Sequence, residues 1–196
     1  MSELFSIQLQ NRQQSRDGIW LDLPTTTEQV QAALRQIGIS SDNPQGLFIS
    51  GYFAEEEKRF AIPYNMVLAS NVDELNFLAS RLETLSTGER AELNAALQVP
   101  QSELSSIGRI TDFPENVDYY VHLPDVHGPA QLGDYYLNRS GMVDMPEEWK
   151  GGIDTAQFGR YVAQQEQGAF TQYGYLVKSG DEWQKVHEGQ PVPEEY

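Results

Sequence analysis

Negative charge is concentrated in one segment of this chain. From Thr111 to Glu148 there are eight acidic residues against a single basic residue, Arg139. The acids are Asp112, Glu115, Asp118, Asp125, Asp134, Asp144, Glu147 and Glu148. Like charges held close together repel one another and lower the stability of a folded state. A segment that is otherwise rich in Tyr, Val and Leu and still keeps this charge calls for a functional explanation.

The whole chain is acidic as well. Its 196 residues include 13 Lys and Arg against 29 Asp and Glu, which gives a formal net charge of −16. Such a surface repels nucleic acid and anionic lipid, so the charge argues against a DNA-binding or membrane-binding protein. Two interpretations stay open at this point. The charge either keeps the protein dispersed or presents a ligand-like surface to a basic groove of a partner.

Composition indicates a folded protein of the cytoplasm. Hydrophobic residues make up 39% and aromatic residues 11% of the chain, which is too much apolar surface for a disordered one. Cysteine is absent, as suits a reducing compartment. The N-terminus has no secretion signal, and no stretch approaches 18 consecutive apolar residues. We therefore expect a cytoplasmic protein.

The first part of the chain, residues 1–63, predicts a small mixed α/β domain. Residues 4–10 and 18–23 alternate in polarity as strands do, and 47–53 is a further strand. Thr26 with Gln29 has the pattern of a capping box that starts a helix between the second and third strands.

The middle part, residues 64–101, predicts a helical hairpin. Asn71 with Glu74 and Ser86 with Glu89 have the pattern of two helix starts, and leucines follow each at helical spacing.

Residues 102–179 predict a second mixed domain. Residues 118–123 resemble a strand, 129–140 a helix, and 169–178 a tyrosine-rich strand, while Asp154 caps another helix that runs through Gln165. Residues 180–196 form a C-terminal extension that we expect to end in a frayed tail from Pro191. The predicted class is α+β, with three small domains in a row.

Known catalytic and metal-binding patterns are missing from the sequence. His122 and His127 share neither a helix face nor strand spacing, so ordinary surface histidines are favoured over a metal site. No nucleophile elbow, phosphate loop or dinucleotide fingerprint is present. Paired tyrosines such as Tyr119-Tyr120 could stack on bases, but with so few cations nearby we interpret them as core and interface residues. We predict that the protein is not an enzyme and needs no metal or cofactor.

Several segments resemble the ArdA antirestriction family. The run Leu132–Gly141, followed by Val143 and Pro146, then Gly152-Ile153-Asp154 and Phe158–Tyr161, is similar to the antirestriction motif of that family. Upstream, Gly18–Leu23, Phe48–Tyr52 and Glu74-Leu75-Asn76 fall in the family's order. The resemblance covers roughly residues 4–178, and it lies in the order and spacing of these pieces.

This resemblance implies a function and a shape. Members of the family are implied to be dimers of three small domains, forming an elongated, curved, acidic particle that imitates B-form DNA and is carried on conjugative elements. The implied partner is a Type I restriction-modification enzyme, whose DNA-binding site the protein would occupy. The carboxylates expected to imitate phosphates, called here the predicted mimic acids, are the eight residues named above and Asp154. The alternative hypothesis is an acidic adaptor that binds another basic partner.

We also predict a homodimer. Five residues put apolar surface beside the charged one, and such a patch is commonly an interface. They are Tyr135, Tyr136, Leu137, Met142 and Val143. The resemblance implies pairing through the same region.

Overall fold

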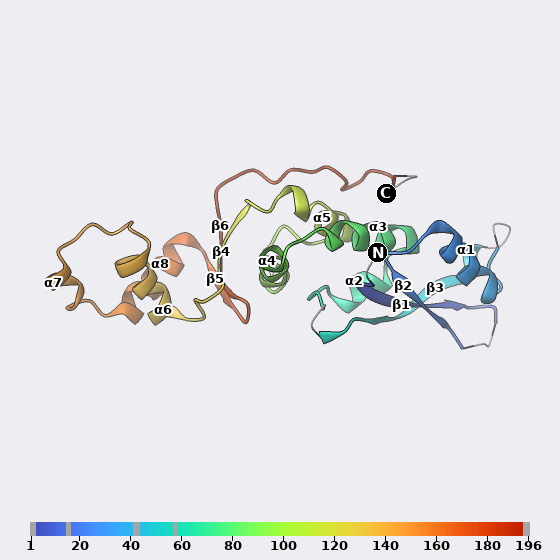
Figure 1. Cartoon of the computed structure of the whole chain (residues 1–196), viewed down its shortest axis with the longest axis horizontal. Helices are drawn as coiled ribbons and strands as arrows, with labels where there is room; N and C mark the ends of the chain where they lie inside the picture. The colour runs from blue at the N-terminus through green and yellow to red at the C-terminus, as the bar shows by residue number, and fades with distance from the viewer. Residues whose placement is uncertain (1–2, 15–16, 41–43, 57–58, 194–196) are drawn as a thin grey trace. The chain divides into compact units, whose positions relative to one another are not determined.

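The computed structural model describes residues 3–14, 17–40, 44–56 and 59–193. Its described residues form two three-stranded antiparallel sheets and several helices, so the α+β class is confirmed. The chain divides into two compact units, each made of separate stretches of sequence (Figure 1). Unit 1 contains residues 1–86, 103–115 and 184–196, and unit 2 contains residues 87–102 and 116–183. The predicted boundaries at residues 63, 101 and 179 and the elongated, curved arrangement stay predictions.

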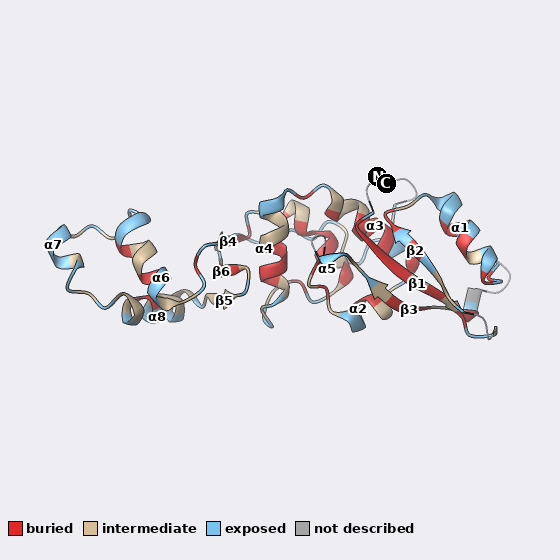
Figure 2. Cartoon of the chain, turned by 60° about the horizontal axis from the view of Figure 1, so that its bottom comes forward, coloured by how far each residue is buried: buried red, intermediate tan, exposed pale blue. Residues whose placement is uncertain are grey.

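Unit 1 is built on a sheet with strand order β2-β1-β3. Its strands are β1 (Phe5–Asn11), β2 (Ile19–Leu23) and β3 (Leu47–Phe53), close to the three predicted ranges. Phe5, Ile7 and Leu9 alternate along β1 and are almost completely buried, which is why β1 forms the core of this sheet (Figure 2).

The helices of unit 1 are α1 (Thr27–Gln36), α2 (Tyr64–Leu68), α3 (Val72–Glu83) and α5 (Ile107–Thr111), with 3₁₀ turns η1 (Pro44–Gly46) and η3 (Phe113–Glu115). Two of these helices, α1 and α3, begin where the sequence predicts, and α2 and α5 were not predicted. Both predicted capping boxes of this unit, at Thr26 and Asn71, are present. The buried amide of Asn76 accepts a hydrogen bond from Thr25 N at 2.7 Å and donates one to Thr25 O at 2.9 Å, and so ties α3 to the end of β2.

Unit 2 joins a small sheet, of order β4-β6-β5, to a set of helices. Its strands are β4 (Tyr120–Leu123), β5 (Ala169–Thr171) and β6 (Gly174–Lys178). Its helices are α4 (Thr87–Leu97), α6 (Pro129–Asp134), α7 (Glu147–Lys150) and α8 (Thr155–Glu166), and a π-helical turn, η4 (Tyr135–Arg139), continues α6.

Two predicted elements of unit 2 differ from the structure. The single strand expected over 169–178 is a hairpin, because the chain turns at Gln172-Tyr173. Gly174, which starts β6, has a φ of +118°, and an added Cβ there would collide with the carbonyl oxygen of Leu123. The regular helix expected over 129–140 changes to π geometry, in which Ser140 N donates to Tyr135 O at 2.8 Å. One extra residue in a turn does not disturb the apolar spacing enough to be seen in the sequence.

The C-terminal extension returns to unit 1. Residues 184–193 have no helix or strand, but the backbone N–H groups of His187 and Glu188 donate to the carboxylate of Asp112 at the C-terminal end of α5. Of the predicted frayed tail, Val192 is half-buried, and residues 194–196 lie outside the described part of the chain.

Candidate functional site

The first two predicted mimic acids belong to unit 1, and neither is freely exposed. Asp112 ends α5 and has no accessible surface. Its carboxylate accepts the backbone N–H groups of His187 at 2.6 Å and Glu188 at 3.3 Å. Glu115 is half-buried and forms an ion pair with Arg81. Asp112 therefore has a structural role here and presents no surface to a partner.

The next three predicted mimic acids lie in unit 2. Asp118 and Asp125 are exposed, on either side of β4. Asp134 is half-buried at the end of α6, where it pairs with Arg139 at 3.2 Å and accepts a hydrogen bond from Asn138 Nδ2 at 2.8 Å. Two of these three carboxylates are thus open to a partner, and the third is partly neutralised.

The remaining four lie in or at the end of the connection between α6 and α8, and all are exposed. Asp144 precedes α7, and Glu147 and Glu148 form its first turn. Glu147 pairs with Lys150 Nζ at 2.6 Å, while Asp154 caps α8 by accepting the N–H of Gln157 at 2.9 Å. Within residues 117–156, which the structure describes throughout, Asp118, Asp125, Asp144 and Glu148 form no ion pair.

Two glycines allow α6 and α8, the helices on either side of this connection, to pack closely together. A Cβ added to Gly133 in α6 would collide with the carbonyl oxygen of Thr155, and one added to Gly159 in α8 would collide with that of Pro129. The two helices therefore cross backbone to backbone, which only glycine permits at both positions. Both glycines belong to the segments that carry the family resemblance.

A carboxylate at the end of α8 links this pair of helices to the sheet of unit 2. Glu166, the last residue of α8, accepts hydrogen bonds from the hydroxyl groups of Tyr136 and, at 3.0 Å, Tyr175. Burial, followed by the hydrogen bond to Glu166, raises the pKa of both tyrosines above the usual value, so both remain protonated donors. Tyr135 and Tyr136 pack against the core of Val126, Leu132 and Tyr175. This packing agrees with their interpretation as core residues.

Asp118 also faces other carboxylates within unit 2. Burial, together with the neighbouring charges of Glu89 and Asp118, raises the pKa of Glu92 in α4 from 4.5 to about 8. Like charges near a half-buried acid favour its neutral form. Glu92 therefore keeps its proton to a higher pH than an ordinary glutamate does, whereas Asp118 is exposed to solvent.

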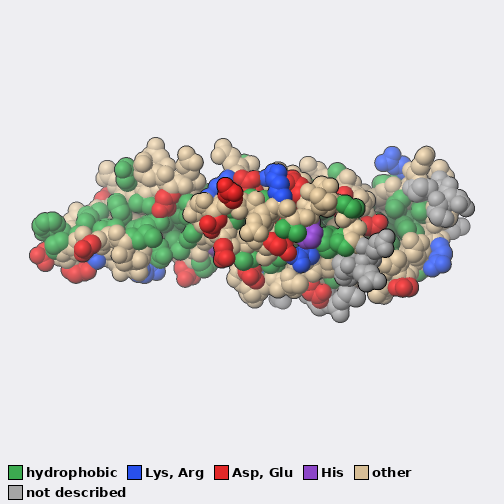
Figure 3. All heavy atoms as spheres, turned by 90° about the horizontal axis from the view of Figure 1, so that it is seen from above, with side chains coloured by type: hydrophobic (Ala, Val, Ile, Leu, Met, Phe, Trp, Pro, Cys, Tyr) green, Lys and Arg blue, Asp and Glu red, His purple; other side chains and the backbone are tan. Residues whose placement is uncertain are grey.

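The predicted dimer residues divide into exposed and internal ones. Leu137 is 3% exposed and belongs to the interior of its own chain, whereas Met142 is 76% exposed. Two further exposed apolar residues that the sequence analysis missed, Trp149 and Tyr161, also lie in unit 2. Figure 3 shows hydrophobic side chains gathered over the part of unit 2 that contains α6, α7 and α8, with acids along its border.

Sequence reasoning also missed acids of unit 1. This unit has 17 Asp and Glu against 8 Lys and Arg, and unit 2 has 12 against 5, so the larger excess lies outside the segment singled out above. Exposed carboxylates of unit 1 include Glu3, Asp22, Glu28, Asp73 and Glu74. Charge counted by unit would have found them, whereas a search for the densest run did not.

Each of the three histidines has different surroundings within its own unit. His122 contacts the carbonyl oxygen of Tyr173 through Nε2 at 2.7 Å, His127 is exposed, and His187 packs on Phe77. Among the described residues, no group of three or more metal-binding side chains comes together. The helices of the described ranges also include none that is long and apolar enough to cross a membrane.

Comparison with known proteins supports the family resemblance noted in the sequence. A family model described as "Antirestriction protein (ArdA)" matches residues 14–177, which is most of the chain. No curated protein matches the sequence.

Proposed function

Because the chain belongs to the ArdA antirestriction protein family, we propose that it occupies the DNA-binding site of a Type I restriction-modification enzyme by presenting carboxylates in place of phosphates. Membership of this family implies an antirestriction function directed at Type I enzymes, and an inhibitor rather than an enzyme. The mimicry, the occupied site and the residues involved are our proposal.

The observation that carries the proposal is the state of the acids in unit 2. Among the residues that the structure describes, Asp118, Asp125, Asp144 and Glu148 are exposed and have no cationic partner. Glu147 and Asp154 are exposed with one contact each inside the chain. A carboxylate without an internal cation can pair with a Lys or Arg of a DNA-binding groove. Duplex DNA carries one charge per ~1.7 Å of axis, so an excess of 16 charges corresponds to roughly 27 Å of duplex. We leave the buried Asp112 out of the proposed surface.

A competition experiment tests this function. A Type I enzyme is mixed with labelled DNA that contains its target, and the protein is added in increasing amounts at several salt concentrations. We expect the DNA to be displaced, with an apparent affinity that falls steeply as salt rises. Inhibition without displacement of DNA, or displacement that does not depend on salt, would favour the acidic adaptor instead.

We further propose that the protein is a homodimer that pairs through the exposed apolar surface of unit 2. Met142 and the half-buried Val143, Tyr135 and Tyr136 stay in the proposed interface, and Trp149 is added to it. Leu137 is left out because it is buried within its own chain. Sedimentation at micromolar concentration should show a dimer, and Met142→Glu together with Trp149→Glu should shift it to a monomer. Wild-type protein that sediments as a monomer would refute the pairing.

A further inference from the structure

The outer face of α3 and α5 in unit 1 holds the chain's own C-terminal segment, residues 184–192, called here the strap. The centre of the strap is a tight turn in which Gln190 N donates to His187 O at 3.0 Å. Gly189 has a φ of +77°, which a residue with a side chain adopts only with strain. The strap thus presents a defined turn, His187-Glu188-Gly189-Gln190, to the two helices.

The buried carboxylate of Asp112 binds the backbone of this turn. It accepts two consecutive N–H groups, those of His187 and Glu188, and it has no accessible surface. Hydrogen bonds to a charged acceptor are stronger than neutral ones, and shielding from water preserves that strength. The contact depends on the backbone N–H groups rather than on side chains. Proline at position 187 would have no hydrogen to donate and would therefore lose one of the two hydrogen bonds.

Arg109 binds the acidic side chain of the turn. Its Nε donates to Glu188 Oε1 at 2.8 Å and its Nη1 to Glu103 Oε2 at 2.5 Å. The hydrogen bond from Arg109 holds the pKa of Glu188 below its usual range, so Glu188 binds as a carboxylate. Lys185, within the strap, adds a second cation 3.3 Å from the same carboxylate.

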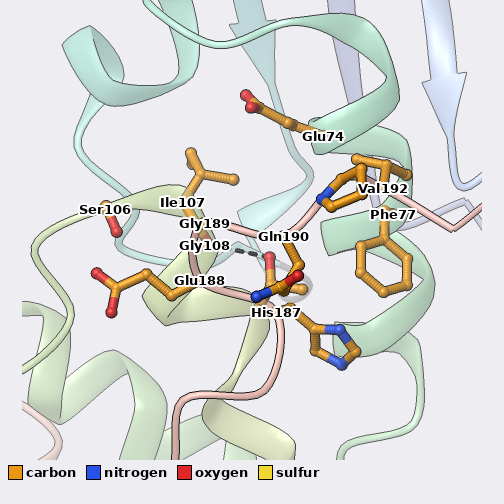
Figure 4. Close-up of a pocket in the computed structure, with 12 residues that line it drawn as sticks. Glu74, Phe77, Ser106, Ile107, Gly108, His187, Glu188, Gly189, Gln190 and Val192 are labelled. Atoms are coloured by element: carbon orange, nitrogen blue, oxygen red, sulfur yellow. Dashed lines mark hydrogen bonds between the residues drawn. The ribbon is translucent and has the colours of Figure 1, made fainter.

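The floor of the site fits the turn closely. A Cβ on Gly108 would lie 3.2 Å from the Cα of Glu188, so the absence of a side chain there lets the strap approach. Phe77 meets the His187 ring edge to face, with centroids 5.0 Å apart. A cavity of about 340 Å³ remains between the strap, Glu74 and Phe77 of α3, Ile107 of α5, and Ser106, which caps the start of α5 (Figure 4).

We propose that this face of unit 1 is a docking site for an acidic peptide turn, which the strap occupies in the intact chain and which a separate peptide of the same chemistry can occupy. Every contact is non-covalent, so a separate peptide can form the same set. The carboxylate of Asp112 accepts two N–H groups, Arg109 binds the glutamate, and Phe77 contacts the histidine ring. Gly108 leaves room for the backbone of the turn. The strap lies beyond residues 14–177, the part of the chain that the family model matches, whereas the residues that bind it lie within that range. Of the predicted mimic acids, the site uses only the buried Asp112, so it does not rest on the proposed DNA mimicry.

The test uses full-length protein in which the strap is released and the docking site is unchanged. His187→Pro removes one N–H donor to Asp112, and a labelled peptide of residues 184–193 is then titrated by fluorescence anisotropy. We expect the peptide to bind the His187→Pro protein at least tenfold more tightly than wild type, because a tethered strap competes at a high effective concentration. Peptides carrying His187→Pro or Glu188→Gln are the matched controls and should bind at least tenfold more weakly. Absence of saturable binding, or equal binding of all three peptides, would overturn the proposal.

Hydrogen exchange gives a second test, and its first measurement uses the wild-type chain, so a folding defect of a variant does not affect it. The amides of His187 and Glu188 should exchange slowly, and Glu188→Gln should speed their exchange several-fold. Glu182→Gln, an exposed change just before the strap, should leave them protected. Exchange of both wild-type amides at the rate of an unstructured peptide would also overturn the proposal.

Discussion

Gly159 of α8 lies so close to Gly133 of α6 that a Cβ on Gly159 would come 2.8 Å from the backbone nitrogen of Gly133. Gly159→Ala should therefore force the helices apart and lower the free energy of unfolding by about 1–3 kcal/mol, the range typical of overpacking. Gly151→Ala is the matched control, because nothing lies within 4 Å of its added Cβ. Urea denaturation measures the free energy of unfolding of both variants. Equal stability of the two would contradict the close helix crossing.

Glu166 should stabilise unit 2 through its two tyrosine hydroxyl groups. Glu166→Ala leaves the hydroxyls of Tyr136 and Tyr175 without this acceptor, at a cost of about 1–3 kcal/mol. In a background of Tyr136→Phe and Tyr175→Phe, the same change should cost much less, because the donors are gone. A double-mutant cycle by urea denaturation measures the difference, and strictly additive effects would show that the hydrogen bonds contribute nothing.

Much of the fold is readable from the sequence because local rules act within a few residues. The capping boxes at Thr26 and Asn71 and the alternation along β1 depend only on near neighbours, and the structure has them where they were predicted. The π-helical turn at Tyr135 and the hairpin at Gly174 depend on packing against segments far away in sequence.

The candidate site shows the same limit. The sequence shows that residue 112 is an aspartate. It does not show that this side chain is buried and bound to His187, a residue 75 positions later in the chain. Asp125 and Asp144 have the same chemistry and are exposed. The pattern of acids therefore predicts where charge accumulates, and only the tertiary structure separates acids that face a partner from those that hold the chain together.

Asp112→Asn should lower stability, unlike changes at exposed acids. Loss of the charge weakens two hydrogen bonds to a buried carboxylate, at an expected cost of about 1–3 kcal/mol, and frees the strap. Asp125→Asn, the exposed control, should change stability by less than about 0.5 kcal/mol. Thermal unfolding and hydrogen exchange measure the two variants, and an equally small effect of both would contradict the anchoring role of Asp112.

Glu92 should make stability depend on pH. In the unfolded chain it loses its proton near 4.5, whereas the folded chain keeps it up to about pH 8. The contribution of Glu92 is thus fully present below pH 4.5 and is lost as pH rises through 8. Glu92→Gln should remove that decline and, with half-exposure taken into account, stabilise the protein at pH 8.5 by on the order of 1 kcal/mol. Parallel pH profiles of wild type and Glu92→Gln would contradict the raised pKa.

The most direct test of DNA mimicry is a series of single and cumulative neutralisations, scored by protection of DNA in a Type I cleavage assay. The series covers the exposed acids Asp118, Asp125, Asp144, Glu147, Glu148 and Asp154. Each carboxylate paired with a surface cation contributes about 0.2–1 kcal/mol, so a single Asp→Asn or Glu→Gln should weaken inhibition by less than about tenfold. Asp↔Glu exchanges at the same positions, which keep the charge, are the control and should inhibit as wild type does. We expect that neutralising all six weakens inhibition by at least about tenfold while circular dichroism shows an intact fold. Full inhibition by the folded sixfold variant, or loss of all inhibition through one residue alone, would contradict DNA mimicry.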